Sequence, residues 1–327
     1  MKRWFICVCI ILSVLLFESS AYTDENTLVL RFAHGGTADH PYQVGAVKFA
    51  EIVQRESSGD IKIEIYPDGE LGSEGEAGEG VRLGVIDIAV ISAGGMMSHW
   101  VPEVQVLDMP YLFRSREHAY KVLDGEIGEY FNKKMEERGF KNLAYWEIGV
   151  RHMTNNRKEV KYPADIEGMK IRVMAANVYR AMIRELNAIP IPIPFTKVYS
   201  AFQGRIIDGQ ENPVTTIRAM RFYEVQKYLS LTAHTYSSAV VIMNSKKYDA
   251  LSGRQKQILK NAAMLTGTYQ RNYVRAKESE DMEYLINQGM IVTVPDRASF
   301  AKKMANVAHA ISDEISETMI QKIKSVK

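Results

Sequence analysis

Cysteine is nearly absent from this chain of 327 residues, which contains only Cys7 and Cys9. Both lie in an apolar run over residues 4–17 that follows a short basic start. The run is too short to span a bilayer comfortably, and the small residues 19–21 after it are typical of a cleavage site. We therefore predict a cleaved export signal over residues 1–21 and a periplasmic mature chain. That mature chain would lack thiols, disulfides and thiolate metal sites.

The rest of the sequence also lacks long hydrophobic runs, an excess of charge and familiar catalytic motifs. No later stretch approaches the length of a transmembrane helix, so we expect a soluble mature chain. The formal charge of +2 gives no reason to expect a nucleic-acid partner. There is no G-x-S-x-G elbow, Walker loop, H-E-x-x-H motif or Cys/His cluster with metal spacing. We expect no enzyme activity, catalytic residue, cofactor or metal.

The glycine-rich run over residues 75–84 superficially resembles a dinucleotide fingerprint. Its spacing is wrong, and the carboxylates of Glu74, Glu76 and Glu79 would repel a pyrophosphate. We therefore reject that interpretation.

The first third of the chain predicts an α/β fold. A strand over Leu28 to Phe32, a helix over Tyr42 to Ser57 and a strand over Ile61 to Tyr66 form a βαβ unit, which predicts a parallel sheet covered by helices. Val104 to Leu107 also reads as a strand. Few helix breakers occur over Ser252 to Asn287, so this segment predicts a helix long enough to reach across two lobes.

Two segments share one plan, which indicates two similar α/β units. Val81 to Ser92 and Phe202 to Pro213 each contain a helical end, a glycine, a β-branched pair and an aspartate, namely Asp87 or Asp208. We predict that these aspartates mark equivalent places in two halves. Ligands of open α/β sheets bind beyond the ends of the strands, so we expect a ligand between the halves, near the polar run over residues 208–212.

Three alternate prolines, Pro190, Pro192 and Pro194, interrupt a strand-like segment. Proline has no backbone N–H to donate to a ladder. This segment must therefore lie on an edge of the sheet or act as a connector.

Two arginines are the strongest candidates for a ligand site. The planar guanidinium of arginine holds a carboxylate with two parallel hydrogen bonds and stays charged at any relevant pH. Arg172 interrupts an apolar strand, and Arg151 follows another strand. An inward arginine must be paired, either by an incoming ligand or by a resident acid such as Asp208 or Glu211. Both alternatives remain open from the residues alone.

Other candidates are weaker individually. Phe195 directly follows Pro194 at a strand end, where it could pack on a ligand. His34 and His40 share a loop but have no third metal ligand, which favours hydrogen bonding. Further donors and acceptors that could face the cleft are Asn212, Asp39, Ser73, Glu74, Ser92, Asn177 and His234.

Several motifs together resemble the solute-binding subunits of tripartite ATP-independent periplasmic (TRAP) transporters, the DctP-type family. The motifs are Gly149-Val150-Arg151, Lys170 to Val173, Pro194 to Tyr199, Asp208 to Pro213 and Phe222 to Lys227, with first-half matches at Pro110 to Phe113 and Tyr66 to Gly72. The resemblance covers nearly the whole mature chain.

This resemblance implies a two-lobed periplasmic binding protein fold with two chain crossovers and a long helix spanning both lobes. We expect one lobe over 22–148 and 238–277, and the other over 149–237 and 278–327. The lobes would close on an acidic solute and deliver it to a sodium-driven membrane permease. Arg172 would form the bidentate salt bridge with the carboxylate, supported by Arg151 and Asn212, while Phe195 would pack on the apolar face of the solute.

Two departures bear on the solute. Sialic-acid members of the family have a glutamate where this chain has Ser92, and an asparagine where it has Ala175. The many expected donors and acceptors suit a sugar acid, such as a uronate or an aldonate. A four-carbon dicarboxylate and sialic acid remain alternatives. An enzyme acting on sugar acids, with Glu74 and His34 as acid and base, is the rival from another class, and a receptor that feeds a sensor is a third possibility.

Overall fold

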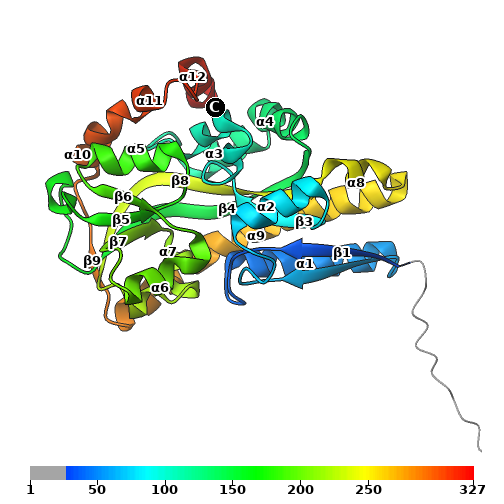
Figure 1. Cartoon of the computed structure of the whole chain (residues 1–327), viewed down its shortest axis with the longest axis horizontal. Coiled ribbons are helices and arrows are strands. Elements are labelled where there is room, and N and C mark those ends of the chain that lie inside the picture. The colour runs from blue at the N-terminus through cyan, green and yellow to red at the C-terminus, as the bar shows by residue number, and fades with distance from the viewer. Residues whose placement is uncertain (1–26) are drawn as a thin grey trace, which may run out of the picture.

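The computed structural model describes residues 27–327, so the predicted export signal over 1–21 lies outside the described residues. Within residues 27–327, nine strands form one mixed sheet in the order β2-β1-β3-β8-β4-β7-β5-β6, with β9 paired to β8 (Figure 1). The strands are β1 Leu28–Ala33, β2 Ile61–Tyr66, β3 Ile88–Ser92, β4 Phe140–Asn155, β5 Lys170–Val173, β6 Ile189–Pro192, β7 Gly209–Asn212, β8 Tyr228–Asn244 and β9 Ile291–Thr293.

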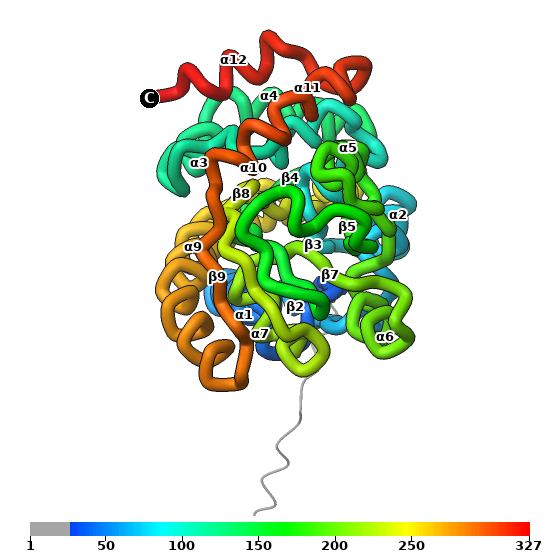
Figure 2. Tube along the Cα trace, turned by 90° about the vertical axis from the view of Figure 1, so that its left-hand side faces the viewer, coloured from blue at the N-terminus to red at the C-terminus, as the bar shows by residue number. Residues whose placement is uncertain are grey.

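Helices surround this sheet, and the last three lie across its second half and the neighbouring α3 and α4 (Figure 2). The helices are α1 Pro41–Ser57, α2 Glu74–Leu83, α3 Arg116–Leu123, α4 Glu126–Glu136, α5 Asn177–Glu185, α6 Val198–Gln203, α7 Val214–Ala219, α8 Ser245–Ala250, α9 Gly253–Asn287, α10 Arg297–Lys303, α11 Val307–Ala310 and α12 Glu317–Ser325. None of the helices found in residues 27–327 combines the length and apolar character that a membrane span needs.

The sheet consists of two similar parallel parts joined by two long strands. We call β2-β1-β3 the first half-sheet and β6-β5-β7 the second half-sheet; within each, the strands pair in parallel. The strands β4 and β8 pair with each other and with β7 and β3, always antiparallel. Because both long strands pass through the middle of the sheet, the chain crosses between the halves twice, as predicted.

The predicted long helix is α9, which has 35 residues and so a length of about 52 Å at 1.5 Å per residue. Near its start, Asn261 Nδ2 donates to Glu56 Oε1 at the end of α1, at 2.9 Å. Near its end, Arg218 Nη1 of α7 donates to Glu280 Oε1 at 3.2 Å. The helix is therefore attached to elements of both halves.

Trp146 on β4 anchors the core beneath α1. Its side chain is fully buried, and its ring lies 6.1 Å from that of Phe32, which in turn meets Phe49 edge-on at 5.8 Å. A Cβ on Gly45 would lie 2.6 Å from the indole. The glycine thus lets α1 approach the sheet closely over this aromatic cluster.

The strand prediction for Val104 to Leu107 is wrong, because these residues lie in a 3₁₀ helix over Pro102–Asp108. Its backbone hydrogen bonds are local, as in Met109 N to Val106 O at 3.1 Å. A short buried apolar run fits a helical turn as well as a strand, so hydrophobicity alone could not separate them.

Candidate functional site

A cavity of about 150 Å³ lies between the two half-sheets. Its walls are mainly apolar, with a few polar groups. The lining residues are His40, Tyr42, Ser73, Glu74, Gly75, Ser92, Met96, Ile148, Arg151, Arg172, Met174, Ala175, Pro192, Ile193, Pro194, Phe195, Asn212 and Thr216.

Arg172 supplies the cavity with a buried positive charge. It lies on β5, is 2 % exposed, and its Nε donates to the Ile193 carbonyl at 2.9 Å. Within residues 27–327, its guanidinium makes no salt bridge. Burial lowers the pKa of Arg172 to about 10, with Glu211 raising it and Arg151 lowering it further. The group is still a cation at neutral pH, and it can hold an anion in the cavity.

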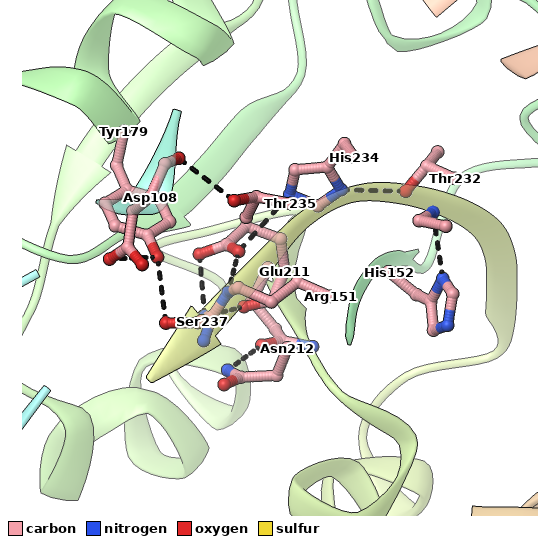
Figure 3. Close-up of polar contacts among 12 residues, drawn as sticks. Asp108, Arg151, His152, Tyr179, Glu211, Asn212, Thr232, His234, Thr235 and Ser237 are labelled. Atoms are coloured by element: carbon pink, nitrogen blue, oxygen red, sulfur yellow. Dashed lines mark hydrogen bonds and ion pairs between the residues drawn. The ribbon is translucent and has the colours of Figure 1, made fainter. Parts of the chain in front are cut away.

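Arg151 is also buried at the cavity wall, but it already has a carboxylate partner (Figure 3). Its Nη2 donates to Glu211 Oε1 at 2.9 Å and to the Glu211 carbonyl at 2.6 Å, and its Nε donates to Glu211 Oε2. Burial alone would raise the pKa of Glu211, but the Arg151 charge and hydrogen bonds hold it below its usual value. The internal ion pair weighed for Arg172 therefore belongs to Arg151.

Asn212 reaches the cavity from the end of β7. Its Nδ2 donates to Gln210 Oε1, Gln210 Nε2 donates to Thr154 Oγ1 at 3.0 Å, and Thr154 Oγ1 donates to Gln226 Oε1 at 2.8 Å. This buried chain of side chains fixes the orientation of the Asn212 amide before any ligand arrives.

Asp208 stands at the other end of β7, just before the strand begins. Its Oδ2 accepts the Lys170 backbone N–H at 2.7 Å, and its Oδ1 pairs with Arg157. Within the polar run over 208–212, Asn212 lines the cavity and Asp208 does not, because the strand separates the two ends of the run.

The first half contributes an acid and hydroxyl groups. Glu74 is the first residue of α2, and its Oε2 accepts from Ser92 Oγ at 3.0 Å and from Ser92 N at 3.2 Å. Burial raises the pKa of Glu74, whereas the Ser92 hydrogen bonds and the charges of Arg172 and Arg151 oppose this. The carboxyl group can accept hydrogen bonds from ligand hydroxyls on the wall contributed by this half.

His40 and Phe195 bring the two halves together beside the cavity. Their rings lie 5.8 Å apart, edge to face. His40 Nε2 is 3.4 Å from Thr216 Oγ1, and Thr37 Oγ1 donates to the Ala219 carbonyl at 3.0 Å. Burial, and then His34, lower the pKa of His40 to about 3, so its imidazole is neutral at physiological pH.

Four predicted site residues do not reach the cavity wall. Asp39 is exposed, and the other three are held by neighbouring side chains. His34 is buried against Gln43, with Nε2 and Oε1 2.8 Å apart. Asn177 is exposed and donates to Glu314. His234 lies behind the Arg151–Glu211 ion pair, with its Nε2 3.4 Å from Glu211 Oε2. Each of these three side chains is held by a neighbour that no spacing rule in the sequence could reveal.

A further polar cluster extends behind Arg151. Tyr179 Oη donates to Asp108 Oδ2 at 2.8 Å and lies 3.3 Å from Ser237 Oγ (Figure 3). Burial raises the pKa of Asp108 to about 7, while the Tyr179 hydrogen bond and the charge of Arg151 oppose the increase. These groups connect the 3₁₀ helix, α5 and β8 below the cavity.

Sequence reasoning missed several wall residues, most of them apolar. Tyr42 lies at the start of α1, after the loop that contains His34 and His40, and Thr216 lies in the first turn of α7, after the polar run over residues 208–212. Their position next to these polar segments was the signal in the sequence that could have identified them. The others carry no chemical signature: Gly75, Met96, Ile148, Met174, Pro192 and Ile193.

Two half-sheets crossed twice by the chain, with a buried unpaired arginine between them, define a binding protein for a small anion. The chain belongs to the bacterial extracellular solute-binding proteins of family 7, the DctP family, whose model matches residues 32–314. Members are solute receptors that bind ligands and are not enzymes, which agrees with the predicted absence of catalysis.

Named relatives and solved structures support this membership. The 2,3-diketo-L-gulonate-binding periplasmic protein YiaO of Escherichia coli is 37 % identical over 278 residues, covering 85 % of this chain and 84 % of that protein. A TRAP periplasmic solute-binding protein from Polaromonas, bound to D-erythronate, superposes with a TM-score of 0.89 at 36 % identity, covering 92 % of this chain and 99 % of that one.

The sugar acid binding protein DctPAm from Advenella mimigardefordensis, in complex with galactonate, also superposes with a TM-score of 0.89. It is 31 % identical and covers 92 % of this chain and 98 % of that one. The predicted two-lobed α/β fold is thereby confirmed.

Proposed function

We propose that this protein is the receptor of a TRAP transporter and captures a sugar acid, whose carboxylate pairs with Arg172. The buried guanidinium of Arg172 carries this proposal. Removing an unpaired charge from water is costly, and a bidentate carboxylate restores hydrogen bonds and charge balance together. The cavity therefore favours an anion over a neutral solute.

The count of free cations favours a single carboxylate. Arg151 is already paired with Glu211, and His40 is neutral, so Arg172 is the one unpaired cation among the described lining residues. A second carboxylate of a four-carbon dicarboxylate would meet Glu74 or an apolar wall. This arrangement supports a monocarboxylate over the dicarboxylate alternative.

The polar groups of the first half favour hydroxyls on the solute. Glu74, Ser92 and Ser73 offer oxygen acceptors on the wall, and the relatives described above bind diketogulonate, erythronate and galactonate. Sialic acid fits less well, because Ser92 and Ala175 replace the residues typical of sialate receptors. A short aldonate or a uronate is the solute class that these observations support.

Closure of the lobes would bend the chain where β4 and β8 cross. The ladder between them shifts register between Glu147 and Gly149, and Gly149 has φ +129°, a value that favours glycine. Gly149 pairs with Ser237 on β8. This irregular point coincides with the proposed boundary between a lobe of 22–148 with 238–277 and a lobe of 149–237 with 278–327.

We assign the receptor to the periplasm, exported by the signal over residues 1–21, where its closed form would deliver solute to the two membrane permease subunits of the transporter. The family membership supports this role, and the small formal charge of +2 gives no reason to expect a nucleic-acid partner.

Thermal shift of the mature protein against aldonates, uronates, dicarboxylates, sialate and amino acids tests the solute class. A ligand at a thousandfold over its Kd adds about 4 kcal/mol to the free energy of unfolding, which raises the Tm by several degrees. A hit restricted to sugar acids supports the proposal. A hit restricted to dicarboxylates or amino acids overturns the solute class.

Calorimetry on Arg172→Lys tests the residue assignment. Lysine keeps the charge but loses the planar fork, so we expect the Kd to rise roughly tenfold or more. Arg157→Lys is the matched control, because that exposed arginine pairs with Asp208 outside the cavity. Unchanged affinity in Arg172→Lys would contradict the assignment.

A further inference from the structure

A second hollow adjoins the cavity and opens outward between the two halves. We call it the vestibule; its volume is about 850 Å³. The residues that line the vestibule but not the cavity are Gly69, Gly72, Glu76, Glu79, His99, Trp100, Thr196 and Lys197. Five of these eight side chains are polar or charged: Glu76, Glu79, His99, Thr196 and Lys197.

The two spaces meet at a ring of five residues that line both. The first half supplies three of them and the second half two: Ser73, Gly75, Met96, Ala175 and Pro194. Glycine, alanine and serine have short side chains, and proline is rigid. Met96 is therefore the one member of this ring with a long, flexible side chain.

Met96 has a fixed backbone and an adjustable side chain. Its N–H donates to the Ser92 carbonyl at 3.2 Å, just beyond the end of β3. Its Sδ lies 3.6 Å from where a Cβ on Gly75 would stand, so the thioether packs against the start of α2, beside Glu74. With three rotatable bonds, methionine adapts its shape to what it contacts.

The cavity alone is small for a sugar acid. A protein cavity of about 150 Å³ holds a molecule the size of benzene, whereas a six-carbon aldonate has about twice as many heavy atoms as benzene. An acid anchored at Arg172 would therefore reach the ring as its chain lengthens, and a still longer acid would have to pass Met96.

We propose that Met96 sets the length of the sugar acid that the receptor accepts, an inference that rests on the carboxylate-binding role of Arg172. Short acids stay inside the cavity. The end of a longer acid passes Met96 into the vestibule, where it meets the carboxylates of Glu76 and Glu79 and the ammonium of Lys197. Glu79 already pairs with Arg82, and Glu76 accepts the Ser73 N–H, so the remaining acceptor capacity of these two carboxylates suits the hydroxyl groups of a neutral tail.

The test is calorimetry with three aldonates of increasing length: D-erythronate, D-gluconate and lactobionate, a gluconate that carries a neutral sugar ring. We expect Met96→Ala to improve the affinity for lactobionate relative to erythronate by about tenfold. Met96→Phe, which fills the ring, should weaken gluconate relative to erythronate by a similar factor. Met96→Leu should keep the wild-type ratios, because it conserves volume.

Two control variants separate length selection from general effects. Met174 lines the cavity but not the vestibule, so Met174→Ala should change all three affinities by similar factors. Met264 is exposed on α9, so Met264→Ala should change none. If Met96→Ala does not fold, as judged by circular dichroism, Met96→Phe carries the test.

The outcomes distinguish this inference from the proposed function. If wild type binds erythronate or gluconate through Arg172 but the ratios stay constant in Met96→Ala and Met96→Phe, the length role of Met96 is overturned and the receptor role stands. If wild type binds none of the three aldonates and binds another class of solute, the proposed function and the inference on Met96 both fail.

Discussion

The first and second half-sheets repeat one backbone plan in the same register. Asp87 accepts the Arg31 backbone N–H at 2.8 Å, and Asp208 accepts the Lys170 N–H at 2.7 Å. Phe32, which follows Arg31, pairs with Ile88, which follows Asp87. In the same way, Ile171 follows Lys170 and pairs with Gly209, which follows Asp208. The predicted equivalence of Asp87 and Asp208 is therefore confirmed.

The chemistry of the halves differs at these matched positions. Ala33 in the first half corresponds to Arg172 in the second, since Ala33 follows Phe32 and Arg172 follows Ile171. Counting on from the aspartates, Val90 corresponds to Glu211 and Ile91 to Asn212. At these three matched positions the first half has only apolar residues, whereas the second half has charged or polar ones, which supports the proposal that the second half holds the carboxylate.

Removing the carboxylate of Glu211 in the second half should have the largest effect on stability. Glu211→Gln leaves the buried Arg151 without a counter-charge, and breaking a buried pair costs about 3–5 kcal/mol. We expect urea unfolding to show a loss of that size, with the slope m unchanged.

The control replaces both charged residues of the pair with apolar ones, as at the matched position of the first half. The double variant Arg151→Met and Glu211→Val removes both charges, and Val90 already occupies the matched position in the first half. We expect it to recover much of the stability lost in Glu211→Gln. A double variant no more stable than the single one would show that the pair is needed for more than charge balance.

The two matched aspartates should differ in their contribution to stability. Asp87 is more deeply buried than Asp208 and contacts both Lys247 and Arg31. We expect Asp87→Asn to cost about 2 kcal/mol and Asp208→Asn about 1 kcal/mol, because hydrogen bonds to buried charges are worth more. Thermal unfolding of both variants measures the difference; equal losses would contradict this ranking.

The next prediction concerns the pH dependence of stability and His40. Burial lowers the pKa of His40 to about 3 in the folded protein, compared with 6.5 in the unfolded chain. Between these values the unfolded state binds more protons, so the free energy of unfolding falls as the pH drops below 6.5. His40→Asn, which can still cap α1, should flatten this dependence by about 1 kcal/mol per pH unit.

Binding gives the complementary readout. His40 stays neutral and Arg172 stays charged between pH 7.5 and 5.5, so a change in affinity over this range should come from Glu74 and Asp108, whose pKa values are raised by burial. Protonation of either acid removes a negative charge near the bound carboxylate, so we expect the affinity to rise on acidification. An affinity that falls on acidification would contradict this expectation.

The sequence allowed the scaffold to be predicted more completely than the site. Periodicity showed the βαβ start and α9, and an apolar strand interrupted by Arg172 was a sound signal for a buried charge. The sequence could not show that Glu211 pairs with Arg151, because this ion pair depends on two strands, β4 and β7, that come from distant parts of the chain. The same limit explains why His234 and Asn177 were expected in the cavity and the apolar Met96 was not.

The edge strand β6 has a consequence for how this chain behaves among its neighbours. Ile189 and Ile193 donate their N–H groups inward, to Met169 and Val173 of the adjacent segment. Pro190 and Pro192 occupy the alternate positions, whose N–H groups would otherwise point outward. That rim of the sheet therefore offers no amide hydrogens there to an incoming strand, which protects the protein against edge-to-edge aggregation.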